Sequence, residues 1–181
     1  MQERKLMEMV EAAGTIAIVG HVRPDGDCVG SCLAVCNYIT EQYPEKTVDV
    51  YLETPPAKFS YLKQFERISS DSNTGKQYEL CICLDSGDRE RLGNNVVYLD
   101  TAKTSICLDH HITNKGYAAK NFVNANASAT CEFLYDFLDE EKIAQEAQYD
   151  GLYAVCTAAG LPVGLPPLVG RRLPISTYSV K

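Results

Sequence analysis

The segment that most constrains the fold of this chain spans residues 20–27 and reads GHVRPDGD. It follows an apolar run at residues 15–19 and precedes residues 29–42, whose apolar spacing predicts a helix. A strand that ends in a histidine and two aspartates before a helix brings metal-ligand side chains to the carboxyl edge of a sheet, where open α/β folds bind their ligands. The segment therefore predicts an α/β fold with a metal site.

Three side chains of this segment are candidate ligands: His21, Asp25 and Asp27. Pro24 and Gly26 interrupt regular structure, so we expect all three ligands on a loop that can wrap an ion. One imidazole and two carboxylates suit Mn²⁺ or a similar divalent ion better than a structural zinc ion, which favours thiolates. The amino end of the helix that follows would attract a phosphate group through its dipole and free amides.

Further apolar runs predict a parallel sheet. Residues 47–52, 78–84 and 104–108 have the composition of strands. The last two runs are largely apolar, without a polar residue at every second position, as strands buried on both faces are. The other elements that we expect are helices at residues 2–13, 130–138 and 140–154, a short helix around 59–65, a short strand at 121–124, and a helix cap at Asn126 or Ser128.

The strands at 78–84 and 104–108 end in polar groups that a metal site needs. Asp85 follows the first, and the triplet Asp109-His110-His111 ends the second. Parallel strands would bring these groups to the edge that holds His21. The triplet is also compatible with an ordinary turn, but consecutive histidines point in different directions. One can then hold a metal while the other faces a substrate, with Asp109 orienting the ring.

The positions of the histidines favour metal binding over an ordinary role in the core or on the surface. The chain has 3 histidines, and each lies beside an aspartate at a predicted strand end. Histidines in general are more often ordinary core or surface residues. Asp85 is favoured as a ligand because it ends its strand, whereas Asp88 suits a helix cap or an outer position. Two ions about 4 Å apart would clamp a phosphoryl group for in-line attack by water, which makes phosphoester hydrolysis the natural reaction class.

Composition limits the other possibilities. A chain of 181 residues with 45% hydrophobic content can form one domain with a core, plus a tail. The net charge of −7 argues against a broad basic surface for nucleic acid, although a small anionic substrate could bind through metal ions. No signal peptide or run of 18 apolar residues is present, so we expect a cytoplasmic protein that does not bind membranes.

Cysteine usage fits a reducing compartment. The chain has 8 cysteines, of which Cys28, Cys32 and Cys36 recur on one helix face. Small buried thiols explain this pattern better than disulfides. No CxxC pair is present, so spacing argues against a cysteine metal site.

The segments GHVRPDGDCVGS, CICLDSGDRERLG and ICLDHH resemble the first three motifs of the DHH phosphoesterase superfamily. The resemblance is closest to its oligoribonuclease/PAP phosphatase (NrnA-like) group. ASATCEFLYDFL is similar to the segment that follows in that group, so the likeness covers residues 1–157 as a DHH domain. Motifs in the right order and at fitting separations are specific. The resemblance implies a Rossmann-like parallel sheet flanked by helices.

The resemblance also implies roles for particular residues. The metal ligands would be His21, Asp25, Asp27, Asp85, which both ions share, and His110. His111 would bind the scissile phosphate and assist as acid or charge stabiliser, with Asp109 behind it. The implied cofactor is a pair of Mn²⁺ ions, or Mg²⁺ or Co²⁺.

The resemblance implies a phosphoesterase acting on RNA or nucleotides. The implied reactions are 3′-5′ exonucleolytic hydrolysis of short oligoribonucleotides and removal of the 3′-phosphate of 3′-phosphoadenosine 5′-phosphate. Other superfamily members hydrolyse inorganic pyrophosphate or cyclic dinucleotides with the same residue types. The motifs alone do not choose among these substrates.

The chain departs from the family pattern after the last helix. Ala158 stands where the family has an aspartate ligand, so the second metal site would be weaker unless water or Asp88 substitutes. Residues 158–181 form a proline-rich tail that resembles nothing in the family, and the C-terminal DHHA1 domain is not seen. We expect a truncated or frame-shifted phosphoesterase, or else an inactive remnant that binds metal or nucleotide. Apolar surface left open would favour a homo-oligomer.

Overall fold

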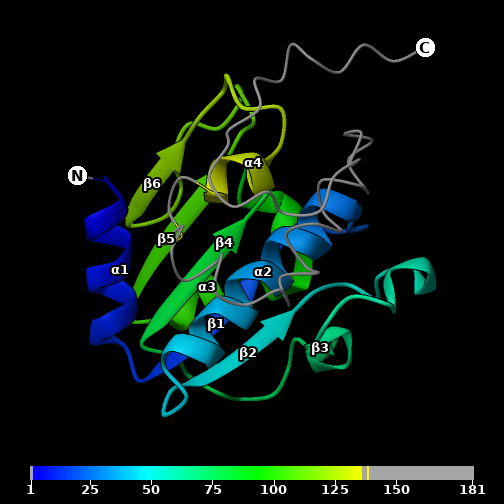
Figure 1. Cartoon of the computed structure of the whole chain (residues 1–181), viewed down its shortest axis with the longest axis vertical. Coiled ribbons are helices and arrows are strands. Elements are labelled where there is room, and N and C mark those ends of the chain that lie inside the picture. The colour runs from blue at the N-terminus through cyan, green and yellow to red at the C-terminus, as the bar shows by residue number, and fades with distance from the viewer. Residues whose placement is uncertain (1, 136–137, 139–181) are drawn as a thin grey trace, which may run out of the picture.

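A parallel sheet forms the centre of the computed structural model, which describes residues 2–135 and 138 (Figure 1). The 6-stranded sheet has the order β3-β2-β1-β4-β5-β6, and every pair is parallel. The strands are β1 (Thr15–Val19), β2 (Thr47–Tyr51), β3 (Ile68–Ser69), β4 (Leu80–Leu84), β5 (Thr104–Asp109) and β6 (Lys120–Val123). The first three strands are added toward one edge of the sheet and the last three toward the other, so the strand order reverses between β1 and β4. Doubly wound folds bind ligands at the carboxyl ends of the strands beside such a switch point.

Helices cover both faces of the sheet, which confirms the predicted α/β architecture. One face carries α1, α2 and α4, and the other carries α3 with the 3₁₀ turn η3 (Figure 1). The helices are α1 (Gln2–Ala12), α2 (Gly26–Gln42), α3 (Val96–Thr101) and α4 (Thr130–Tyr135), and the 3₁₀ turns are η1 (Ala57–Phe59), η2 (Phe65–Arg67) and η3 (Glu90–Asn95).

The two faces of the sheet have different cores. Successive side chains of a strand point to opposite faces, and in β4 the larger Ile82 faces the α2 side while Cys81 and Cys83 face α3. The small residues on the α3 side leave room for aromatic rings. Tyr51 and Tyr98 stack there with ring centroids 3.9 Å apart. Both cores hold the strands in the register that sets the site.

Some local predictions were wrong. The expected helix around 59–65 is absent from the described structure, where η1 and η2 flank a left-handed Gln64 with φ 61°. The sequence did not predict the strand β3, the 3₁₀ turn η3 or the helix α3. These elements are too short for a hydrophobic period, or they contain residues that favour strands. The expected helix at 140–154, Ala158 and the tail at 158–181 lie outside the described residues.

None of the described helices combines the length and the apolar character that a membrane span requires. The cysteines that the structure describes are free and buried, as the sequence predicts.

Candidate metal centre

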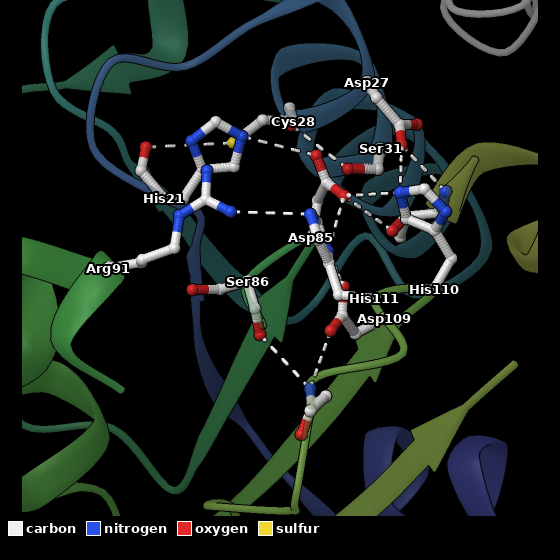
Figure 2. Close-up of polar contacts among 12 residues, drawn as sticks. His21, Asp27, Cys28, Ser31, Asp85, Ser86, Arg91, Asp109, His110 and His111 are labelled. Carbon is white, nitrogen blue, oxygen red and sulfur yellow. Dashed lines mark hydrogen bonds and ion pairs between the residues drawn. The ribbon is translucent and has the colours of Figure 1, made fainter. Parts of the chain in front are cut away.

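Three neighbouring strands deliver imidazole and carboxylate groups to one edge of the sheet (Figure 2). His21 follows β1, Asp85 follows β4 and His110 follows β5. The Nε2 atom of His21 lies 3.4 Å from Oδ2 of Asp85. The Nε2 atom of His110 lies 3.6 Å from the other oxygen of Asp85, Oδ1. Asp85 therefore sits between two imidazoles that come from different strands.

Backbone carbonyls orient both rings. His21 Nδ1 lies 2.8 Å from the carbonyl oxygen of Val22, and His110 Nδ1 lies 3.2 Å from that of Ala127. Because a carbonyl can only accept, each Nδ1 carries the donated proton. Each Nε2 then faces the carboxylates, which is how metal-binding histidines are usually held.

Asp85 is held in an unusual backbone conformation. Its φ of 55° lies in the left-handed region, which aspartate tolerates better than most residues. Its side chain is buried, and Oδ1 accepts a hydrogen bond of 2.9 Å from the hydroxyl of Thr130. The amide of Asp85 donates to the carbonyl of Leu108. Backbone strain of this kind is common at functional sites, where surrounding contacts maintain it.

The structure corrects the expectation for the amino end of α2. Asp25 is the N-cap, and its Oδ1 accepts the amides of Asp27 and Cys28, each at 3.1 Å. Its backbone carbonyl accepts the amide of Val29. These amides are therefore engaged and do not offer the expected phosphate site. The cap also starts the helix at Gly26, so Asp27 lies on the first turn of α2 and not on a loop.

Asp25 and His21 form a charged pair at this end of the helix. His21 Nε2 lies 3.7 Å from Asp25 Oδ1. The contact with the His21 ring lowers the pKa of Asp25 to about 2, and the amides of Cys28 and Asp27 contribute. Burial lowers the pKa of His21, but the carboxylates of Asp25 and Asp85 outweigh burial and raise it to about 12. The carboxylates thus strongly favour positive charge at the ring.

Asp27 connects α2 to α4. Its Oδ2 accepts the amide of Thr130 at 2.8 Å, and its Oδ1 accepts the amide of Cys131 at 3.0 Å. This carboxylate, and not the expected side chain of Asn126 or Ser128, satisfies the first amides of α4. The same Oδ2 lies 3.7 Å from Nε2 of His110. Burial raises the pKa of Asp27, and the negative charge of Asp85 raises it further.

This set of donors fits divalent cations. The separations of 3.4–3.7 Å between imidazole nitrogens and carboxylate oxygens exceed those of good hydrogen bonds. Ligands that share an ion at about 2.1 Å typically lie about 3 to 3.5 Å apart. Asp27 and Asp85 also repel one another, which a cation between them would relieve. His21 and Asp25 could hold an ion on one side of Asp85, and Asp27 and His110 could hold one on the other.

His111 has a different environment from the candidate ligands. Its Nδ1 donates to Oδ1 of Asp109 at 2.7 Å, and Asn114 donates to the other oxygen of that carboxylate at 2.7 Å. Asp109 is fully buried. Although His111 Nδ1 is 3.8 Å from Asp85, this bond to Asp109 leaves only Nε2 free to react. Asp109 thus orients the ring, in the manner that the sequence suggests.

Arg91 also belongs to the site, and the sequence reasoning missed it. Its Nη1 lies 3.4 Å from Nε2 of His111, a contact that Figure 2 shows as a dashed line. Its carbonyl accepts the amide of Val22 at 2.7 Å, and its amide donates to Asp88. Asp88 therefore caps this turn, as one of its two expected roles requires. An arginine six residues after a site aspartate was the available signal.

Known proteins resemble this chain across most of its length. The Streptococcus mutans protein named probable bifunctional oligoribonuclease and PAP phosphatase NrnA is 32% identical over 136 residues, which are 74% of this chain and 41% of that protein. The Bacillus subtilis bifunctional oligoribonuclease and PAP phosphatase NrnA is 29% identical over 138 residues, which are 76% of this chain and 42% of that protein. This chain therefore matches less than half the length of these curated relatives.

The fold and the family model agree with these similarities. An exopolyphosphatase-related protein from Bacteroides fragilis superposes with a TM-score of 0.69 at 19% identity, covering 88% of this chain and 48% of that one, which shows a shared fold. The family model described as DHH family, N-terminal domain, matches residues 15–161, a range that contains every candidate ligand described above. This chain belongs to the DHH family.

Proposed function

We propose that this chain carries the catalytic centre of a Mn²⁺-dependent phosphoesterase that hydrolyses short oligoribonucleotides, 3′-phosphoadenosine 5′-phosphate, or both. The observation that carries the proposal is the position of Asp85. Its two oxygens face the Nε2 atoms of His21 and His110 at 3.4 and 3.6 Å, so one carboxylate is available to two metal positions. This is the arrangement that two-ion hydrolysis of phosphate esters requires.

Each half of the centre has a distinct task in this proposal. His21 and Asp25 would hold one ion and Asp27 and His110 the other, with one oxygen of Asp85 available to each position. Bound divalent ions supply polarisation of the phosphoryl group and activation of the attacking water. Imidazole and carboxylate ligands suit Mn²⁺, and Mg²⁺ or Co²⁺ could replace it.

His111 and Arg91 serve the substrate and not the ions. The bond from His111 Nδ1 to Asp109 leaves Nε2 to face the substrate, where the doubly protonated ring would donate a proton to a phosphate oxygen or leaving group and the neutral ring would accept one. The guanidinium of Arg91 lies 3.4 Å from that Nε2 and would reach a phosphate bound there, and arginine binds phosphate oxygens with two parallel hydrogen bonds. Together they would orient an anionic substrate despite the net charge of −7.

The substrate class rests on similarity. The names of the relatives from Streptococcus mutans and Bacillus subtilis specify an oligoribonuclease and PAP phosphatase. We extend these substrates to this chain as a proposal, since it matches less than half of each relative. We also propose a cytoplasmic location, because buried free thiols suit a reducing compartment.

The test is a Mn²⁺-dependence assay on the full chain. A diribonucleotide and 3′-phosphoadenosine 5′-phosphate are incubated with protein and Mn²⁺, and products are separated by chromatography. We expect hydrolysis with Mn²⁺, none with a chelator, and a large loss in His110→Ala. Asp100→Asn, which removes the carboxylate of an exposed ion pair with Arg89, is the matched control.

The outcomes separate the competing functions. Metal binding without hydrolysis of either substrate would favour the inactive metal- or nucleotide-binding remnant. Hydrolysis of pyrophosphate or a cyclic dinucleotide instead would keep the reaction class and correct the substrate. Hydrolysis that persists in His110→Ala would mean that the activity does not arise at this centre.

A further inference from the structure

The thiol of Cys28 lies within the buried half of the candidate centre. His21, Cys28 and Asp85 each offer a ligand atom, and these atoms lie within 4.8 Å of one another. Figure 2 shows the sulfur beside the His21 ring, toward Asp85. All three residues are buried. The family resemblance assigns no role to this cysteine, and the spacing of cysteines gave no signal, because its partners come from other strand ends.

The backbone holds the thiol in this position. Cys28 lies on the first turn of α2, where its amide donates to Asp25, and its Sγ lies 4.0 Å from the carbonyl oxygen of His21. Gly20 provides the space. A Cβ at Gly20 would lie only 2.4 Å from the Cys28 sulfur and 2.7 Å from Leu52 Cδ2. Because Gly20 has no side chain, the Cys28 sulfur can lie close to the imidazole of His21.

We propose that the His21 side of the centre is a mixed nitrogen, oxygen and sulfur site that takes a thiophilic divalent ion, such as Zn²⁺ or Co²⁺, with Cys28 as a ligand. This inference deepens the proposed function, because it concerns one of the two metal positions proposed there. The other side, with Asp27 and His110, offers only oxygen and nitrogen and keeps the preference for Mn²⁺ or Mg²⁺. The two positions would therefore differ in metal preference.

Binding of an ion at this site would release protons from the ligands and would need only small shifts of the ligand atoms. The metal–sulfur bond forms as the S–H bond breaks, and the metal–nitrogen bond forms as His21 Nε2 gives up its proton. Both protons pass to the buffer, with no change of oxidation state. Ligands around a tetrahedral zinc ion lie about 3.5 Å apart, so groups within 4.8 Å close on an ion through shifts of about 1 Å. Thiolate with imidazole favours zinc and cobalt strongly over manganese.

Cobalt absorption tests the proposal without relying on activity. The full chain is titrated with Co²⁺, and two signals are followed: the visible d–d bands, which report bound cobalt, and the near-ultraviolet sulfur-to-cobalt charge-transfer band, which reports a thiolate ligand. We expect both signals in the natural chain. Cys28→Ala should lose the charge-transfer band, while Cys32→Ala, one turn along the same helix, should keep it.

A competition measurement adds a second readout. We expect Cys28→Ala to weaken Zn²⁺ binding by about tenfold or more in equilibrium dialysis, and to leave Mn²⁺ binding nearly unchanged. Bound Co²⁺ without a charge-transfer band in the natural chain would overturn the inference and leave the proposed function standing. A band that survives Cys28→Ala would also overturn it. Failure of every ion to bind would overturn both proposals.

Discussion

The two sides of the candidate centre share Asp85, but their imidazoles differ in burial. On one side the His21 side chain is only 3% exposed and Cys28 is fully buried, whereas the carboxylate of Asp25 at its rim is 68% exposed. On the other, the side chains of His110 and His111 are 24% and 30% exposed. On the second side Arg91 lies next to His111, with Nη1 3.4 Å from Nε2. The exposure of these imidazoles favours the second side as the one that meets the substrate.

Physical chemistry explains why the sides differ in this way. A charge buried away from water is costly unless it is paired, and His21 is paired with both Asp25 and Asp85. His110 and His111 are partly exposed and therefore accessible to a phosphate. The hydrogen bond from His111 Nδ1 to Asp109 fixes the orientation of that ring. The buried side therefore provides rigidity, and the open side provides access.

Helix α4 connects the two sides. Asp27 accepts two amides of this helix, and the hydroxyl of Thr130 on the same turn donates to Asp85. A displacement of α4 would thus move a ligand of the open side and the bridging carboxylate together. Four variants can test how far the two sides act separately.

Asp85→Asn should have the largest effect, because it removes the charge that both sides share. We expect loss of both metal equivalents and a fall in kcat of about two to three orders of magnitude. Isothermal titration with Mn²⁺ and steady-state kinetics measure the two quantities. Asp100→Asn, an exposed carboxylate paired with Arg89, is the control. Binding of both ions by Asp85→Asn would contradict a bridging role.

Asp109→Asn should affect only the open side. The amide would weaken the bond that orients His111, so we expect kcat to fall by about a hundredfold, as for loss of general acid–base catalysis. Mn²⁺ affinity should stay unchanged, because Asp109 contacts His111 and Asn114 and not the candidate ligands. A parallel loss of metal binding would show that the two sides are not separable.

The elements that lie behind this comparison differ in how well the sequence predicts them. β4 is apolar throughout and β5 has an apolar centre at 106–108, and such runs are typical of strands buried on both faces, so the parallel sheet follows from them. Once the sheet is parallel, its carboxyl ends meet, and His21, Asp85 and His110 come together. The convergence of the candidate ligands was therefore predictable without coordinates.

Contacts made through irregular segments were not predictable. Arg91 meets His111 across 20 residues, and Thr130 meets Asp85 across 45 residues. No period relates these pairs, because the turn at η3 and the start of α4 are positioned by packing. The sequence did not predict the capping of α4 by Asp27 for the same reason, since Asp27 is 103 residues from Thr130.

Arg91→Ala should weaken substrate binding without affecting either ion. Loss of a charge-assisted contact to phosphate costs about 1.5 to 3 kcal/mol, so we expect KM to rise by about ten- to a hundredfold. Arg91→Lys should recover part of this loss, since lysine keeps the charge but not the planar fork. Arg89→Ala, two residues away and paired with Asp100, is the matched control. An unchanged KM in Arg91→Ala would remove Arg91 from the substrate site.

Thr130→Val should have the smallest effect of the four, because it removes one hydroxyl and keeps the backbone amide that Asp27 accepts. Asp85 would lose the 2.9 Å hydrogen bond that orients Oδ1, and loss of such an outer contact typically weakens metal binding by about tenfold. The control is Thr40→Val, whose hydroxyl donates within α2 to Cys36 and Asn37.

The Thr130 contact is made through Oδ1, the oxygen that faces His110, whereas Oδ2 faces His21. Thr130→Val should therefore weaken the ion on the open side more than the ion on the buried side, which titration resolves as two separate affinities. Thr130→Ser, which retains the hydroxyl, should restore both. Equal weakening of both ions would show that Asp85 moves as one body and that the two sides share their rigidity.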